Sequence, residues 1–129
     1  MTSFENIPSD ELTLVIVNHG IIPSEVNGKP LLKMSVELHH EDKRLLDFQE
    51  YYPPTFADKL NELGLDIHCV LEDEWFSFEI DGCSYDLNIW IDDIRNQLDA
   101  SIYPIVEDEH GPDTDCSQLI HRITNIKFN

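Results

Sequence analysis

The stretch from Trp75 to Trp90 constrains the fold of this chain more than any other, because it alternates around a strong turn signal. Asp81-Gly82 is a dipeptide that favours the type I′ turn of a two-residue β-hairpin. With that turn, Ile80 pairs with Cys83, and the residues further along both strands follow in register. The pattern predicts an antiparallel hairpin whose apolar face consists of Phe76, Phe78, Ile80, Cys83, Tyr85 and Leu87.

The opposite face of this hairpin is polar apart from its tryptophans. Its members are Trp75, Ser77, Glu79, Ser84, Asp86 and Asn88, and the alternation is expected to continue to about Trp90. An exposed tryptophan among carboxylates is typical of a binding surface. A helix covering this face would instead make Trp75 and Trp90 core residues. The sequence leaves both interpretations open.

Further strands are expected on both sides of the hairpin. Residues 12–17 form an apolar, β-rich run, and residues 32–38 alternate between apolar and polar side chains, as in a half-buried strand. Other strands are predicted at residues 45–52, 67–71, 102–106 and 119–128. The third of these is expected near a sheet edge, because Pro104 has no backbone donor. Residues 21–30 and 107–115 are predicted to be loops.

Two helices are expected between these strands. The first follows Pro53-Pro54, with Thr55 as its N-cap and Gly64 as its stop signal. The second is predicted to begin near Asp92, and its inward-facing residues would be Ile91, Ile94 and Leu98. The predicted fold class is therefore α+β: one domain of residues 1–129, with an antiparallel meander of about five to seven strands and two helices packed on it.

Acidic residues are concentrated in the second half of the chain. Between Asp66 and Asp115 there are fifteen acidic residues and one basic residue, Arg95, so this segment carries −14 of the total −18. Such a field attracts basic partners and repels nucleic acids and anionic membranes. We therefore expect a basic protein partner, with no direct binding to nucleic acid or membrane. The residues predicted to bind it are Glu72, Asp73, Glu74, Trp75, Asp86, Asp92, Asp93, Glu107, Asp108, Glu109, Asp113 and Asp115.

The chain contains none of the motifs that indicate common catalytic or cofactor chemistry. G-x-S-x-G, P-loop, G-x-G-x-x-G and H-E-x-x-H patterns are absent. The three cysteines, Cys69, Cys83 and Cys116, lack the close spacing of a structural zinc site and fit reduced thiols. Residues 107–115 lack the ligand order of a calcium loop. We expect no enzyme activity, no cofactor and no metal, and, without a secretory signal pattern, a cytoplasmic protein.

A small, highly acidic α+β chain without catalytic motifs resembles the immunity proteins of bacterial contact-dependent growth inhibition and related polymorphic toxin systems. The resemblance covers the chain as a whole, in its size, its charge and its acidic segments at residues 72–74, 92–93 and 107–115. It implies tight binding to one cognate toxin domain, often a basic nuclease, whose active site is blocked. The alternatives are a nucleic-acid mimic that inhibits a restriction or CRISPR enzyme, a small enzyme with an unrecognised site, and an orphan regulatory domain.

Overall fold

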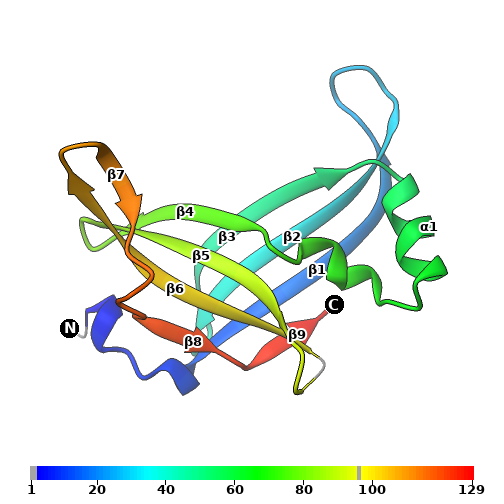
Figure 1. Cartoon of the computed structure of the whole chain (residues 1–129). Helices are drawn as coiled ribbons and strands as arrows, with labels where there is room; N and C mark the ends of the chain where they lie inside the picture. The colour runs from blue at the N-terminus through cyan, green and yellow to red at the C-terminus, as the bar shows by residue number, and fades with distance from the viewer. Residues whose placement is uncertain (1–2, 96) are drawn as a thin grey trace. The chain divides into compact units, whose positions relative to one another are not determined.

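The computed structural model describes residues 3–95 and 97–129, which fall into two compact units. Unit 1 contains the described residues up to Leu12 together with those of Glu72–Asn125. Unit 2 contains Thr13–Leu71 and Ile126–Asn129. Each unit is built on a β-sheet (Figure 1). The predicted α+β class holds in part: the antiparallel sheet content is confirmed, but the described chain is mostly strand, with two sheets and one α-helix in place of one sheet and two helices. In the described part of the chain, no helix has the length and apolar character that crossing a membrane requires.

The sheet of unit 1 contains the predicted hairpin. Its strands are β4 (Trp75–Ile80), β5 (Cys83–Asp92), β6 (Gln97–Asp108) and β7 (Gly111–Thr114), in that order, and β8 (His121–Ile123) also pairs with β6 (Figure 1). Ile80 lies opposite Cys83, and the rest of the expected β4–β5 register is confirmed. Asp81 and Gly82 have φ angles of 54° and 76°, the positive values that a type I′ turn requires.

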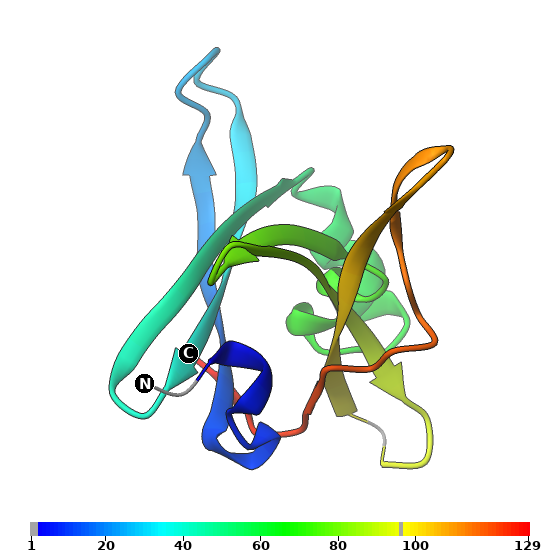
Figure 2. The same cartoon turned by 90° about the vertical axis from the view of Figure 1, so that its left-hand side faces the viewer.

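The N-terminal segment packs on the apolar face of this sheet. It consists of two 3-10 helices, η1 (Phe4–Asn6) and η2 (Ser9–Glu11), and it lies beside β8 in both views (Figure 1 and Figure 2). The Phe4 ring is buried, with its centroid 5.9 Å from that of Phe78 and 5.3 Å from that of Tyr85. The buried apolar residues of the sheet itself are Phe76, Phe78, Tyr85, Leu87, Ile89, Leu98, Ala100, Ile102 and Ile123.

His121 ties the N-terminal segment to β8 through both of its ring nitrogens. Its Nε2 lies 2.8 Å from the Phe4 carbonyl oxygen, and its Nδ1 lies 2.9 Å from Oγ of Ser9. Because a carbonyl only accepts hydrogen bonds, Nε2 donates to Phe4 and Nδ1 accepts from the Ser9 hydroxyl. Burial lowers the pKa of His121, against smaller opposing effects of the Phe4 carbonyl and the Glu5 carboxylate. The imidazole is therefore held in its neutral form.

We expect this histidine to make unit 1 less stable as the pH falls below 6.5. The unfolded side chain takes up a proton near its ordinary pKa of 6.5, whereas the buried imidazole does so only at lower pH. Between the two values the unfolded chain holds more protons, so stability is complete above pH 6.5 and is lost as the pH falls through this window. Denaturant unfolding followed by tryptophan fluorescence measures this, because both tryptophans lie in unit 1.

The variant His121→Gln provides the control for this prediction. Glutamine keeps a polar side chain at position 121 but does not titrate, so the difference in unfolding free energy between about pH 7.5 and pH 5.5 should shrink. An unchanged pH dependence in His121→Gln would show that other groups are responsible.

Unit 2 contains a four-stranded sheet in the order β3 (Lys43–Tyr52), β2 (Pro30–His40), β1 (Leu12–Pro23) and β9 (Ile126–Phe128). The β2–β3 pair is antiparallel and the β1–β9 pair is parallel. The alternation predicted for residues 32–38 is confirmed, although Ser35 on the polar face is also buried. Within unit 2, the buried apolar side chains of this sheet are Leu14, Ile16, Leu32, Met34, Val36, Leu38 and Tyr52.

The helix predicted after Pro53-Pro54 is present as α1 (Thr55–Glu62), and it ends before Gly64, whose φ is +71°. Thr55 is not its N-cap. The cap is Pro54, and the backbone N–H groups of Phe56 and Ala57 donate to the carbonyls of the two prolines. These main-chain bonds satisfy donors that a threonine side chain would otherwise serve. Residues 67–71 form the 3-10 helix η3 (Ile67–Leu71), so the strand predicted there is wrong.

The second predicted helix, near Asp92, is also wrong. Strand β5 extends to Asp92, the chain turns, and β6 begins at Gln97. The Asp92 carboxylate accepts hydrogen bonds from the backbone N–H groups of Ile94 (3.0 Å) and Arg95 (3.3 Å), which stabilises the turn. Ile94 is consequently 97% exposed, although its spacing from Ile91 suggested an inward-facing helical position. The spacing of apolar residues was helical by coincidence, because these residues belong to a strand and a turn.

The C-terminal half differs from prediction in three further places. Pro104 lies inside the twelve-residue strand β6, between the segment paired with β8 and the segment paired with β7, where the neighbouring strand changes. Residues 107–115, predicted to be a loop, contribute to the β6–β7 hairpin. Residues 119–128 form two short strands, β8 and β9, which belong to different sheets.

Candidate functional site

The acidic charge of this protein belongs mainly to unit 1. Unit 1 contains seventeen Asp and Glu residues and two arginines, a net charge of −15, whereas unit 2 contains nine acidic and six basic residues, a net charge of −3. The fold therefore sharpens the asymmetry seen in the sequence, because it adds the acidic residues of the N-terminal segment to those of residues 72–125. A charge of this size and sign attracts cationic groups and repels anionic ones.

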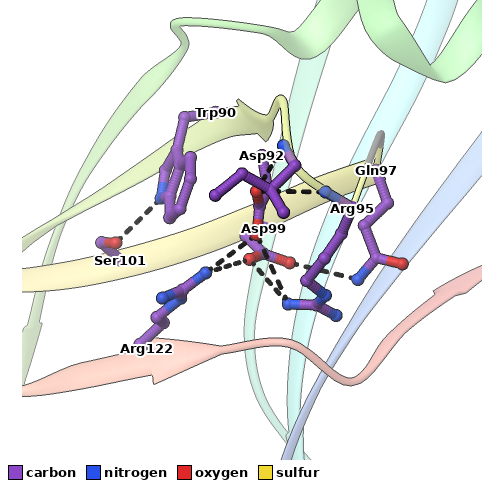
Figure 3. Close-up of polar contacts among 8 residues, drawn as sticks. Trp90, Asp92, Arg95, Gln97, Asp99, Ser101 and Arg122 are labelled. Carbon is purple, nitrogen blue, oxygen red and sulfur yellow. Dashed lines mark hydrogen bonds and ion pairs between the residues drawn. The ribbon is translucent and has the colours of Figure 1, made fainter.

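The two arginines of unit 1 both contact the same two aspartates. Arg122 Nη2 lies 2.9 Å from Asp99 Oδ2 and 3.1 Å from Asp92 Oδ2, and Arg95 Nη1 lies 3.1 Å from Asp99 Oδ2 (Figure 3). Asp99 is completely buried. Its hydrogen bond is the main cause of a raised pKa of Arg122. Both arginines of unit 1 thus form ion pairs within the unit.

This cluster contains a buried charged residue, Asp99, that the sequence did not reveal. Asp99 lies directly opposite Trp90 in the β5–β6 register. This pairing could not be predicted while the residues after Asp92 were expected to form a helix. Asp92, predicted to bind a partner, is mostly buried in the same cluster. Its carboxylate is therefore occupied by the turn and by the arginines.

The two tryptophans have different environments. Trp90 is half-buried: its Nε1 donates to Ser101 Oγ at 2.9 Å, and the Arg122 guanidinium lies 5.0 Å from its ring centroid (Figure 3). Trp75 is 48% exposed, and its ring lies 6.3 Å from that of Tyr103 at an angle of 33°. Trp75 is thus the more exposed of the two tryptophans.

Asp86 lies on the same face of the sheet, between the strands that carry the Trp75 and Tyr103 rings. In the register, Tyr103 is opposite Asp86, and Trp75 is opposite Asn88, so the two rings come from the strands on either side of β5. Asp86 is mostly buried, and its carboxylate accepts hydrogen bonds from the hydroxyls of Ser77 and Thr114. Both donors are uncharged, so neither contact pairs Asp86 with a cation.

The β6–β7 hairpin carries four exposed carboxylates. Its exposed acidic residues are Glu107, Asp108, Glu109 and Asp113. The turn is held by a hydrogen bond of 2.8 Å from the backbone N–H of His110 to Asp108. Asp115 is half-buried and accepts hydrogen bonds from Ser117 and Gln118, and those from Ser117 are the main cause of its lowered pKa.

The remaining predicted partner-binding residues lie at the other end of β5. Glu72 and Asp73 are exposed and Glu74 is half-exposed in the segment before β4. This segment is bound to β5 because the backbone N–H of Asp73 donates to the Ile89 carbonyl and the N–H of Ile89 donates to the Glu74 carbonyl. Asp93 is exposed in the β5–β6 turn. The register thus places a cluster of acidic residues near each end of β5, with the Trp75–Tyr103 pair between the two clusters.

A shallow hollow of about 410 Å³ lies beside the β4–β5 turn in unit 1. Its lining residues are Glu5, Gly82, Cys83, Ser84, Tyr85, Pro104, Ile105, Glu107 and Pro112. Burial is the main cause of a raised pKa of Tyr85, and the Glu5 carboxylate adds to it, so the phenol stays neutral. The lining contains carboxylates but no basic side chain, which makes it unsuited to an anionic ligand.

Comparison of the chain with protein-family models, with curated proteins and with solved structures found no match.

Proposed function

We propose that unit 1 binds a basic protein and that the chain inhibits that protein in the manner of an immunity protein. The observation that carries this proposal is the charge of −15 on unit 1, whose two arginines are both engaged by Asp92 and Asp99. Complementary potentials accelerate encounter and fix the orientation of two proteins. The exposed Trp75 adds the kind of aromatic contact that slows dissociation.

The proposed partner is a toxin nuclease domain. A nuclease binds the phosphates of its substrate with lysine and arginine side chains. The exposed carboxylates of the β6–β7 hairpin, such as Glu107 and Asp108, would occupy those positions and exclude the substrate. Inhibition would then come from blocking a groove, without any reaction by the inhibitor.

A charge-reversal variant tests this proposal. Changing Asp93, Glu107, Asp108 and Glu109 to Lys alters the charge of unit 1 from −15 to −7. We expect association with the basic partner to slow by roughly tenfold or more at low salt, and its salt dependence to flatten, because electrostatic steering raises association rates by about 10–10³. The partner is first captured from the native host and identified by mass spectrometry, and the rates are then measured by surface plasmon resonance.

The matched control places the same change of charge in unit 2. Glu25, Asp42, Asp58 and Glu62 are exposed there, and changing these four to Lys alters the net charge of the chain equally. We expect this control to bind at nearly the wild-type rate. Equal slowing in both variants would contradict a surface on unit 1, and capture of only a mixture of basic proteins, all lost at high salt, would contradict a dedicated partner.

A further inference from the structure

We infer that the Trp75–Tyr103 pair is a subsite for an arginine side chain of the basic partner. The inference rests on the proposed function for the source of the arginine, and on the local structure for the chemistry. Trp75 keeps 48% of its surface exposed, in contact with the Tyr103 ring. A planar guanidinium stacks on such aromatic faces, and tryptophan attracts a cation more strongly than other aromatic side chains do.

The negative charge near these rings is not balanced by a cation of unit 1. Asp86, opposite Tyr103, accepts only uncharged hydroxyl donors in the contacts described above. Glu79 is exposed on the same face, four positions along β4 from Trp75, and adds to the field over this face without lying beside the rings. As far as the described residues show, Arg95 and Arg122 both make their ion pairs with Asp92 and Asp99. A cation from outside is therefore favoured at the aromatic pair.

Unit 1 already holds one guanidinium with this combination of groups. Arg122 lies over the Trp90 ring at 5.0 Å while it bonds Asp92 and Asp99. Trp75 lies on the same face of the same sheet, as the alternation of β4 and β5 places it opposite Asn88, two residues before Trp90. One tryptophan thus has its arginine and its carboxylates, whereas Trp75 has a carboxylate nearby and an exposed ring.

This chemistry predicts a preference for arginine over lysine. Guanidinium is weakly hydrated and planar, so it stacks at little cost, whereas the ammonium of lysine is compact and strongly hydrated. A surface that acted by charge alone would bind the two equally.

Titration of the folded protein with nona-arginine and nona-lysine peptides tests the inference. We expect nona-arginine to shift the indole N–H signal of Trp75 in ¹H–¹⁵N NMR spectra. The signal of Trp90, whose indole N–H is bonded to Ser101, should move much less and serves as an internal control. Trp75→Ala should weaken nona-arginine binding by about threefold to tenfold, and Trp75→Phe by less, because phenylalanine retains a weaker cation–π interaction. Neither variant should change nona-lysine binding by as much.

The outcomes separate this inference from the proposed function. If both peptides bind equally and Trp75→Ala changes neither affinity, the arginine subsite is wrong while the acidic surface stands. If the charge-reversal variant of Asp93, Glu107, Asp108 and Glu109 also binds both peptides with wild-type affinity, the proposed function fails as well. The Trp75 signal of the wild-type protein decides the subsite even if a variant does not fold, because a nona-arginine titration that leaves this signal unmoved overturns it.

Discussion

Replacing Phe4 with alanine is expected to lower the free energy of unfolding of unit 1 by about 3–5 kcal/mol, the cost of removing a phenyl ring from a packed core. Phe4 is 2% exposed, and its ring lies against those of Phe78, Tyr85 and His121. The backbone N–H of Phe4 donates a hydrogen bond to the Asp81 carboxylate, and its carbonyl oxygen accepts one from His121 Nε2. The backbone that carries the ring is therefore fixed on both sides. Because this backbone is fixed, it cannot easily move to fill the cavity that the substitution leaves.

Denaturant unfolding followed by tryptophan fluorescence measures this effect in unit 1. The matched control is Leu119→Ala, which removes an apolar side chain of unit 1 that is half exposed. The control should cost about 1 kcal/mol or less, because little apolar surface leaves the core. Similar losses in both variants would show that the N-terminal segment is not packed on the sheet as described.

Replacing Asp99 with alanine is the second change with a large expected effect. Asp99 is completely buried and accepts hydrogen bonds from Arg95 and Arg122 at 3.1 and 2.9 Å. Breaking a buried ion pair costs about 3–5 kcal/mol when the remaining charge stays buried. The two arginine side chains are 41% and 45% exposed, so water stabilises them and we expect a loss of about 1–3 kcal/mol.

Asp93→Ala is the matched control for Asp99→Ala, since it removes the same charge from an exposed position six residues earlier. With unit 1 at −15, removing an exposed carboxylate relieves repulsion, so the control should be neutral or slightly stabilising. The Trp90 emission should also shift in Asp99→Ala, because Arg122 lies over that ring. Equal stability of the two variants would mean that the buried contacts contribute nothing beyond charge.

The parts of the fold that were predictable are those in which neighbours along the chain decide the structure. Asp81-Gly82 accepts the positive φ angles of a tight turn, and the alternation on both sides then sets the register of β4 and β5. Pro53-Pro54 and Gly64 bound α1 for similarly local reasons. In these places the conformational preferences of a few adjacent residues agree with the fold.

The predictions that were wrong concern segments whose sequence pattern fits two different structures. Ile91, Ile94 and Leu98 have a helical spacing, but Asp92 binds the backbone N–H groups of its own turn and the arginine of a distant strand. Residues 119–128 read as one strand because neighbours in the sequence do not show that the chain passes from one sheet to the other. Such long-range pairings are outside the reach of local propensity.

The sequence by itself determined the sign and place of the charge, the hairpin and most of its apolar face, because composition and local alternation carry these properties. Cys83, predicted on that face, is exposed beside the turn. Only the tertiary structure decided which acidic and aromatic side chains remain exposed to solvent. Trp75 and Trp90 fall on one face of the sheet, yet Arg122, thirty-two residues after Trp90, covers the second tryptophan and leaves the first exposed. The exposure of a side chain depends on what the rest of the chain packs against it, and no local pattern contains that information.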